Sequence, residues 1–174
     1  MPNSPSPIAL IGYRGTGKTT VAKLLAEQLD YNWIDTDDEI EQRNGKSIAA
    51  IFEESGEQVF RDLEAEVVAD LCQREQTILA LGGGAVLREA NQKCLAQCQQ
   101  IVWLRASANT IAQRLSSDPM TASRRPNLTN RGGLHEIEQL LATREPIYRA
   151  CATLEVDTEG KDPAEIVDEI VGSL

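Results

Sequence analysis

The sequence predicts an α/β protein built on a parallel sheet, because short apolar runs alternate with helical patterns along the whole chain. Strands that alternate with helices are joined by right-handed crossovers, which cover both faces of the sheet with helices. The length of 174 residues is that of one domain, and 41% hydrophobic and 25% charged residues are typical of a globular protein. We therefore expect one three-layer α/β/α domain over residues 1–174, with a disordered lead at 1–7.

Five strands and seven helices are expected from the local patterns. The strands are expected at 8–12, 32–35, 77–81, 101–105 and 153–156. The helices are expected at 17–29, 38–44, 47–54, 57–74, 107–116, 134–149 and 163–173. Ser47 stands at a helix start, residues 55–58 resemble a capping box, and Asp162 precedes a proline at the first helical position. The connection at 117–133 is longer than ordinary loops, which predicts a mobile lid.

The most specific pattern is G-x-x-x-x-G-K-T at residues 12–19, directly after the apolar run at 8–11. Its glycines allow positive φ and a close approach to an anion, and the N–H groups of the loop and the dipole of the next helix bind polyphosphate. Lys18 is expected to reach the β- and γ-phosphates, and the Thr19 hydroxyl to ligate Mg²⁺. A glycine-rich turn without a ligand is the alternative. The complete pattern in this context favours binding of a nucleoside triphosphate.

The charge of the chain is unevenly distributed. The net charge of −10 argues against nonspecific binding to nucleic acid or to an anionic membrane. Residues 105–149 nevertheless contain seven arginines, no lysine and four acids, so this stretch carries +3 and the rest of the chain −13. A local excess made of arginine alone favours bidentate recognition of phosphate or carboxylate groups.

The cysteines and the start of the chain bear on cellular location. Cys72, Cys94, Cys98 and Cys151 form no zinc-binding spacing, and small buried hydrophobes in a reducing compartment are their simplest interpretation. The first residues form no signal or transit peptide, and no apolar stretch approaches the roughly 18 residues of a membrane span. We expect a cytoplasmic protein that is not bound to a membrane.

Two acidic side chains stand at the end of the strand expected at 32–35. Asp35 and Asp37 have a period-two spacing, so one can face a magnesium ion and the other an acceptor hydroxyl. Transfer of a phosphoryl group to an alcohol needs a group that orients the hydroxyl and accepts its proton. Simple N-capping of the next helix is the alternative for Asp37 and Asp38, and we expect capping from Asp38.

Three further features extend the candidate site. Arg61 lies three residues before Glu64, a spacing that by itself indicates a structural ion pair. Gly82, Gly83 and Gly84 follow a buried strand, which suits a substrate lying against bare backbone, although a flexible turn is the alternative. Arg125 lies in the expected lid, where an arginine could stabilise charge in the transition state; the adjacent Arg124 is expected at the solvated surface.

Taken together and in order, the motifs resemble those of the shikimate kinase family. They are the loop at 12–19, Asp35-Thr-Asp37, Phe60-Arg61-x-x-Glu64, residues 82–86 (Gly-Gly-Gly-Ala-Val), Arg125-Pro126 and Arg144-Glu-Pro-Ile-Tyr148-Arg149. The similarity spans residues 8–171. It implies transfer of the γ-phosphate of ATP to the 3-hydroxyl of shikimate, with Mg²⁺, on the pathway to chorismate and the aromatic amino acids. It also implies a P-loop kinase fold with a five-stranded parallel sheet ordered 2-3-1-4-5, substrate-binding helices and a mobile lid.

The resemblance also implies a role for each matching residue. The nucleotide would be bound by Gly12, Gly15, Thr16, Gly17, Lys18, Thr19, Thr20, Arg114 and the lid residue Arg125. Shikimate would be bound by Asp37, Arg61, Gly82, Gly83, Gly84 and Arg144, with both arginines on its carboxylate. Lys18, Asp37 and Arg125 would be catalytic, with Asp37 as the base. Thr19, and Asp35 through water, would hold the metal. The lid differs from the common family pattern at Asn127, and residues near 158–163 match too loosely for an adenine contact to be assigned.

Two other functions remain open from the residues. Another P-loop kinase, for gluconate or a nucleoside monophosphate, would share the nucleotide-binding loop but has less need for two arginines on a carboxylate. A non-catalytic nucleotide-binding module would not need Lys18, Thr19, Asp35, Asp37 and Arg125 together. We expect the protein to bind ATP and shikimate and to be a monomer.

Overall fold

The computed structural model of the protein describes residues 5–118 and 133–174. Its strands are β1 (Ile8–Ile11), β2 (Asn32–Asp35), β3 (Thr77–Ala80), β4 (Gln100–Arg105) and β5 (Leu154–Asp157). Its helices are α1 (Lys18–Leu29), α2 (Thr36–Asn44), α3 (Ile48–Leu71), α4 (Glu89–Leu95), α5 (Ala108–Ser117), α7 (Leu134–Cys151) and α8 (Pro163–Val171), with a short 3₁₀ turn η1 (Ala85–Leu87). Strands and helices alternate as the sequence predicts.

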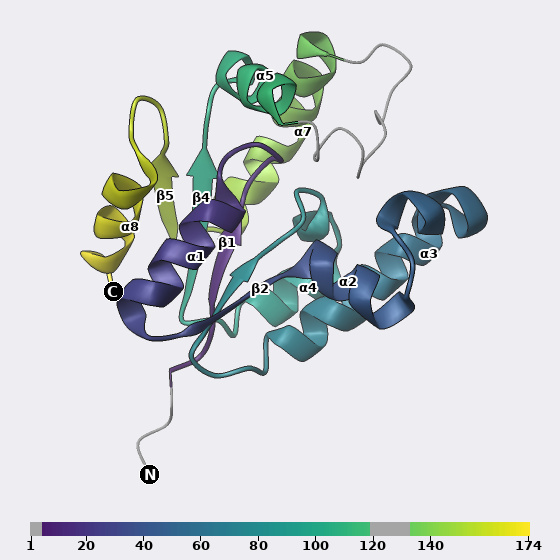
Figure 1. Cartoon of the computed structure of the whole chain (residues 1–174), viewed down its shortest axis with the longest axis horizontal. Helices are drawn as coiled ribbons and strands as arrows, with labels where there is room; N and C mark the ends of the chain where they lie inside the picture. The colour runs from purple at the N-terminus through teal and green to yellow at the C-terminus, as the bar shows by residue number, and fades with distance from the viewer. Residues whose placement is uncertain (1–4, 119–132) are drawn as a thin grey trace.

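All five strands pair in parallel in the order β2-β3-β1-β4-β5, so the expected sheet is confirmed. Because β1 is central and buried on both sides, its alternate side chains supply two separate cores. Ile8 and Leu10 pack with α1 and α8 on one face, while Ala9 and Ile11 pack with α3 and α7 on the other. Figure 1 shows the sheet between these two helical layers. The carboxyl ends of the strands therefore meet at one edge.

Most helix starts agree with their sequence signals. Ser47 caps α3 by accepting the backbone N–H of Ala50, and Asp162 and Glu165 form a complete capping box at α8. The two helices expected at 47–54 and 57–74 join as α3, with the break confined to Gly56 at φ 82° and ψ 173°. This backbone conformation is open to glycine and strained for other residues, so the break occurs there.

The sequence analysis missed η1 and α4. Helix α4 has only seven residues and no side-chain cap, so no start signal marks it. It is held by tertiary contacts: Leu95 is buried, and the side-chain amides of Asn91 and Gln92 donate to the carbonyls of Ala85 and Val86 in η1. Burial and these hydrogen bonds stabilise a helix that local propensity does not predict.

The expected lead and lid are described only in part. The carbonyls of Pro5 and Pro7 accept hydrogen bonds from the backbone N–H groups of Gln76 and Gln99, and Pro7 is buried, so the expectation of disorder is wrong for residues 5–7; residues 1–4 lie outside the described residues. Of the expected lid at 117–133, residues 119–132 lie outside the described residues, and Arg124, Arg125 and Asn127 are among them.

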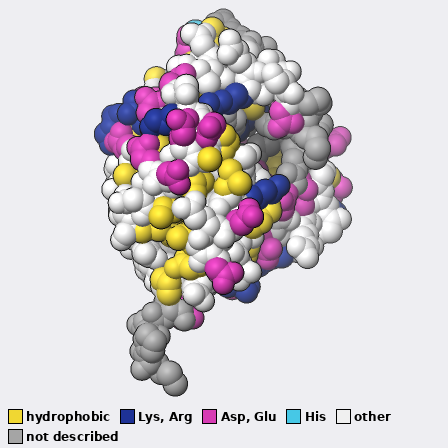
Figure 2. All heavy atoms as spheres, turned by 60° about the vertical axis from the view of Figure 1, so that its left-hand side comes forward, with side chains coloured by type: hydrophobic (Ala, Val, Ile, Leu, Met, Phe, Trp, Pro, Cys, Tyr) yellow, Lys and Arg dark blue, Asp and Glu magenta, His cyan; other side chains and the backbone are white. Residues whose placement is uncertain are grey.

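Figure 2 shows acidic side chains spread over one face of a chain whose net charge is −10. Within residues 5–118 and 133–174, none of the helices combines the length and the apolar character needed to cross a bilayer.

Cys72 is buried as expected, whereas Cys94, Cys98 and Cys151 are half-buried. A hydrogen bond from Cys98 lowers the pKa of the Cys72 thiol.

Candidate active site

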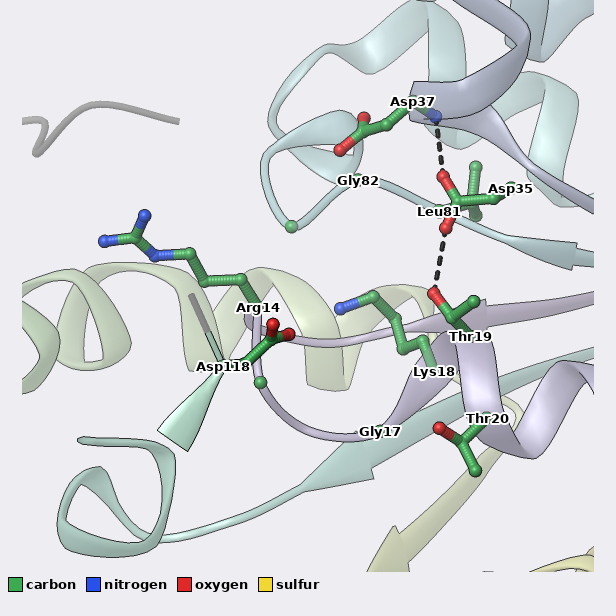
Figure 3. A pocket seen from close by; sticks show the side chains of 12 residues that line it. Arg14, Gly17, Lys18, Thr19, Thr20, Asp35, Asp37, Leu81, Gly82 and Asp118 are labelled. Carbon is green, nitrogen blue, oxygen red and sulfur yellow. Dashed lines mark hydrogen bonds between the residues drawn. The ribbon is translucent and has the colours of Figure 1, made fainter. Parts of the chain in front are cut away.

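A hollow of about 230 Å³ lies beyond the carboxyl ends of β1, β2 and β3. In an open parallel α/β sheet this is the edge at which ligands bind. Figure 3 shows how the lining side chains converge from the loop before α1, the start of α2 and the loop after β3. The lining residues are Arg14, Gly15, Gly17, Lys18, Thr19, Thr20, Asp35, Asp37, Leu81, Gly82, Gly83 and Asp118.

The loop between β1 and α1 needs its glycines for geometric reasons. Gly12, Gly15 and Gly17 have φ values of 142°, 80° and 94°. A Cβ atom at Gly12 would lie 2.5 Å from the carbonyl oxygen of Leu104, so only glycine lets the loop pass β4. Gly17 occupies the N-cap of α1, so the positive end of that helix points at the hollow. This is the anion-binding geometry that the sequence pattern predicts.

Lys18 and Thr16 are held by the loop itself. The Lys18 ammonium donates to the carbonyls of Gly12 and Tyr13 at 2.7 and 2.8 Å. The Thr16 hydroxyl donates to the same Tyr13 carbonyl at 2.8 Å, so Thr16 braces the loop from within and does not line the hollow. Figure 3 shows Lys18 and Asp37 facing the same hollow from opposite sides.

Asp35 forms hydrogen bonds to both sides of the hollow, to α1 and to the start of α2. Its Oδ2 accepts the Thr19 hydroxyl at 2.9 Å, and its Oδ1 accepts the backbone N–H groups of Asp37 at 2.9 Å and Asp38 at 3.3 Å. Asp35 is therefore the N-cap of α2, which starts two residues earlier than expected, and the expectation that Asp38 is the cap is wrong. The reason is geometric: a cap must precede the first turn, and Asp38 lies inside it.

The environment of Asp35 opposes its ionisation. Burial raises the pKa of Asp35 above its ordinary value, and the negative charge of Asp37 raises it further. The hydrogen bond from Thr19 acts in the opposite direction. A carboxylate in such a place is stabilised by a nearby cation.

The glycine segment (Gly82, Gly83 and Gly84) follows β3, and two arginines converge on it. A Cβ atom on Gly84 would lie 2.5 Å from Nη2 of Arg61, and one on Gly83 would lie 3.6 Å from Nη1 of Arg144. Two guanidinium groups from α3 and α7 thus lie beside consecutive glycines, although Gly84 and both arginines lie outside the lining of the hollow itself. Sequence order separates these three elements widely, and the fold brings them together.

Each arginine has a fixed position. Arg61 donates to Glu64 at 2.7 Å and lies 3.6 Å from Glu57, so the structural ion pair expected from helix spacing is present. Glu64 is 1% exposed, and so it provides a rigid, buried anion for Arg61. Arg144 is 7% exposed and lies over the ring of Tyr13, 5.7 Å from its centroid. Neither guanidinium is a mobile surface charge.

Other expected residues lie nearby. Arg114 donates to the Thr158 hydroxyl at 3.2 Å and approaches the Gly15 carbonyl at 3.4 Å, which places it beside the nucleotide-binding loop. Thr20 lines the hollow. Arg125 lies outside the described residues, so the structure does not place it.

Sequence reasoning missed four polar side chains at this site. Arg14 and Asp118 line the hollow, but Arg14 fills a variable position of the loop pattern and Asp118 belongs to no motif. Thr36 and Tyr148 bind the glycine segment through their hydroxyls, at 3.0 Å to the N–H of Gly82 and 2.5 Å to the carbonyl of Gly83. Both stand inside quoted motifs, but only the tertiary structure shows what they contact.

Comparison with known proteins agrees with this geometry. The family model described as shikimate kinase matches residues 14–174. The chain is 44% identical over 167 residues to a shikimate kinase of Rhodopirellula baltica, covering 96% of this chain and 89% of that protein. It is 42% identical to a shikimate kinase of Hahella chejuensis, covering 96% and 85%.

Solved structures give the same result. Shikimate kinase from Acinetobacter baumannii, solved in complex with shikimate, matches with a TM-score of 0.90 and 34% identity, covering 97% of this chain and 92% of that one. A gluconokinase from Sinorhizobium meliloti, with a TM-score of 0.63 and 19% identity over 97% and 90% of the two chains, shares the fold alone. The sheet order, the nucleotide-binding loop and these matches over nearly the whole length agree: the chain belongs to the shikimate kinase family.

Proposed function

We propose that this shikimate kinase transfers the γ-phosphoryl group of ATP to the 3-hydroxyl of shikimate in the hollow at the carboxyl ends of β1, β2 and β3. The observation that carries the proposal is the lining of that hollow. A polyphosphate-binding loop with Lys18 and Thr19 forms one wall, and Asp37 with Gly82 and Gly83 forms the facing wall. A triphosphate and a small acceptor would therefore meet in one space.

On the nucleotide side, the backbone N–H groups of residues 12–17 and the positive end of α1 bind the phosphates. Lys18 now donates to two carbonyls of the loop, and it would exchange these neutral acceptors for the charged β- and γ-phosphate oxygens. Arg114 lies beside the loop and adds positive charge on the nucleotide side. Thr16 keeps the loop closed from within, and Thr20 completes the wall.

The donor set at Thr19 and Asp35 fits a magnesium ion. A hydroxyl and a carboxylate oxygen are hard ligands, and they lie within 2.9 Å of each other. A cation would also offset the unfavourable ionisation of the half-buried Asp35. In the described part of the chain, no group of three or more His, Cys, Asp or Glu side chains is arranged to hold a metal ion. A magnesium ion in kinases needs few protein ligands, so Thr19 and Asp35 would suffice to hold it, and the ion would neutralise phosphate charge.

On the acceptor side, Arg61 and Arg144 hold the carboxylate of shikimate. Their guanidinium groups lie beside Gly84 and Gly83, where the absence of a side chain lets the arginines come close to the backbone. Planar guanidinium groups pair with a carboxylate through two hydrogen bonds each, which sets the orientation of the ring.

Asp37 is proposed as the base of the reaction. The oxygen of the 3-hydroxyl forms a bond to the γ-phosphorus, the bond from that phosphorus to the bridging oxygen of ADP breaks, and the hydroxyl proton passes to the Asp37 carboxylate. Asp37 lines the hollow opposite Lys18, so the base and the charge that stabilises the phosphates are on opposite walls. In this arrangement acceptor and phosphoryl group lie between them.

Other expectations stay predictions. Arg125 as the lid arginine, closure of the lid at 117–133, a monomeric state and a cytoplasmic location follow from the sequence, and the described residues do not test them.

Acceptor specificity tests the proposal. The purified protein is mixed with ATP, Mg²⁺ and one acceptor at a time (shikimate, gluconate or AMP), and ADP release and the mass of the product are measured. We expect rapid ADP release with shikimate alone and a product heavier by one phosphoryl group. Phosphorylation of gluconate or AMP but not of shikimate would contradict the proposal. Tight ATP binding without turnover would instead indicate a nucleotide-binding module.

A further inference from the structure

The glycine segment has no side chains with which to fix its position, so its backbone hydrogen bonds decide where it lies. Four of its six backbone polar groups have a partner. The carbonyls of Gly82 and Gly84 accept from Ala85 and Leu87 in the following turn, at 3.0 and 3.1 Å. The N–H of Gly82 donates to Thr36, and the carbonyl of Gly83 accepts from Tyr148. Among the described residues, the N–H groups of Gly83 and Gly84 have no hydrogen-bond partner. Each can therefore donate a hydrogen bond to water or to a ligand.

The two side-chain partners come from distant parts of the chain. Thr36 is 46 residues before Gly82, and Tyr148 is 65 residues after Gly83. Both side chains are fully buried, at 0% exposure. Tyr148 also packs against Trp103, with ring centroids 5.7 Å apart, so its hydroxyl is aimed by a rigid ring.

Each hydroxyl belongs to a helix that carries other residues of the site. Thr36 stands between Asp35 and Asp37 at the start of α2, and Tyr148 lies one helical turn after Arg144 on α7. The segment is therefore tied on one side to the acidic residues and on the other to a carboxylate-binding arginine. Three consecutive glycines without such ties would sample many backbone conformations. A binding surface made of backbone needs a position fixed to a fraction of an ångström.

We propose that the Thr36 and Tyr148 hydroxyls are positioning groups for shikimate binding, because they hold the backbone of the glycine segment between α2 and α7. The proposal rests on the function proposed above, in which that segment contacts shikimate. Neither hydroxyl touches the substrate; each acts through the backbone group that it binds.

The first test is Tyr148→Phe, which keeps the ring and its packing and removes only the hydroxyl. We expect the shikimate KM to rise about fivefold, the scale of one lost buried hydrogen bond, while the ATP KM stays almost unchanged. Backbone hydrogen exchange in a peptide covering residues 81–88 should speed up, while exchange in β1 stays slow. These measurements detect displacement of the segment rather than loss of the fold.

The second test uses Thr36, where the chain offers a rescue. Thr36→Val removes the hydroxyl with little change of shape and should raise the shikimate KM in the same way, whereas Thr36→Ser keeps a hydroxyl and should restore it. Thr77→Val is the matched control, because Thr77 is also buried, donates to the carbonyl of Glu75 at 2.7 Å and starts the same strand β3 at its far end. It should lower Tm without changing either KM.

Three outcomes would overturn the proposal. The first is a Tyr148→Phe protein that loses stability like Thr77→Val but keeps its shikimate KM. The second is an equal rise of the shikimate KM and the ATP KM in Tyr148→Phe or Thr36→Val. The third is a Thr36→Ser protein whose shikimate KM is as high as that of Thr36→Val. Failure of the underlying function is separate: it would appear as an unmodified protein that does not phosphorylate shikimate, or as an Arg61→Lys protein with an unchanged shikimate KM.

Discussion

The nucleotide side of the hollow comes mainly from one continuous segment, residues 12–20, with Arg114 of α5 beside it, whereas the acceptor side comes from α2, α3, the glycine segment and α7. The hydrogen bonds within the nucleotide-binding loop span three to six residues, as those of Thr16 and Lys18 do, and Arg114 adds one contact to Gly15 from 99 residues away. On the acceptor side, the two side-chain hydrogen bonds to the glycine segment span 46 and 65 residues. A local site keeps its geometry wherever the strand and helix form, while a distributed site depends on the packing of the whole domain.

This difference predicts that substitutions on the acceptor side change shikimate binding or turnover and spare the nucleotide. The largest effect is expected from Asp37→Asn. Loss of the base should lower kcat by about 10²-fold or more, while ATP binding, measured by titration calorimetry, stays almost unchanged. Asp38→Asn is the control, because Asp38 lies on the same helical turn without lining the hollow. An equal loss of kcat in both variants would show that the helix start, not the base, had been damaged.

Arg61→Lys should have the next largest effect. An ammonium group cannot make the two-pronged contact of a guanidinium, so we expect the shikimate KM to rise about tenfold, the equivalent of roughly 1.4 kcal/mol, with the ATP KM unchanged. Arg43→Lys serves as control, because Arg43 forms surface pairs with Glu39 and Asp70. If Arg61→Lys raises the KM for ATP as much as the KM for shikimate, the nucleotide side and the acceptor side of the hollow are not independent.

Gly84→Ala should have a smaller effect through the same arginine. The backbone of Gly84, at φ −99°, accepts alanine, but the new Cβ would lie 2.5 Å from Nη2 of Arg61. Because a flexible side chain yields more readily than backbone, we expect a folded protein in which Arg61 is displaced and the shikimate KM rises a few-fold. Gly172→Ala at the end of α8, at φ −64°, is the control, and steady-state kinetics should show no change for it. An unchanged shikimate KM in Gly84→Ala would show that Arg61 does not contribute to shikimate binding.

The smallest effect concerns a further long-range contact on the nucleotide side, at Glu159, whose carboxylate lies within the electrostatic influence of Arg114. Glu159 accepts the backbone N–H of Ser107 and the hydroxyl of Thr110 at the start of α5, and these hydrogen bonds lower the pKa of Glu159. A lowered pKa means that the ionised form stabilises the fold, fully above its ordinary pKa of 4.5 and not at all below the lowered value. Glu159→Gln should therefore lower Tm by about 1–2 °C at pH 7, since the group is exposed and screened.

The pH dependence is the check on this last prediction. Thermal melts of both proteins should give Tm values that converge as the pH falls below 4.5. A Tm difference that persists unchanged at low pH would assign the loss to the shape of the side chain rather than to its charge.

Local patterns predicted much of the molecule. The alternation of apolar runs and helical patterns led to the correct strands and to the helices around them, because periodicity reports burial directly. The predictions failed where tertiary contacts, rather than local sequence signals, decide the structure. Helix α4 has no cap to mark it, and the acids at 35–38 could not be ranked as caps until the start of α2 was placed.

The α/β alternation, the nucleotide-binding loop and the pair of acids after β2 can all be read from local sequence, because each depends on residues that are neighbours in the chain. The positions of Arg61 and Arg144 beside consecutive glycines, and the hydrogen bonds of Thr36 and Tyr148 to those glycines, are visible only in the folded domain. Contacts between residues far apart in sequence depend on how helices pack on the sheet, and neither propensity nor spacing encodes that packing.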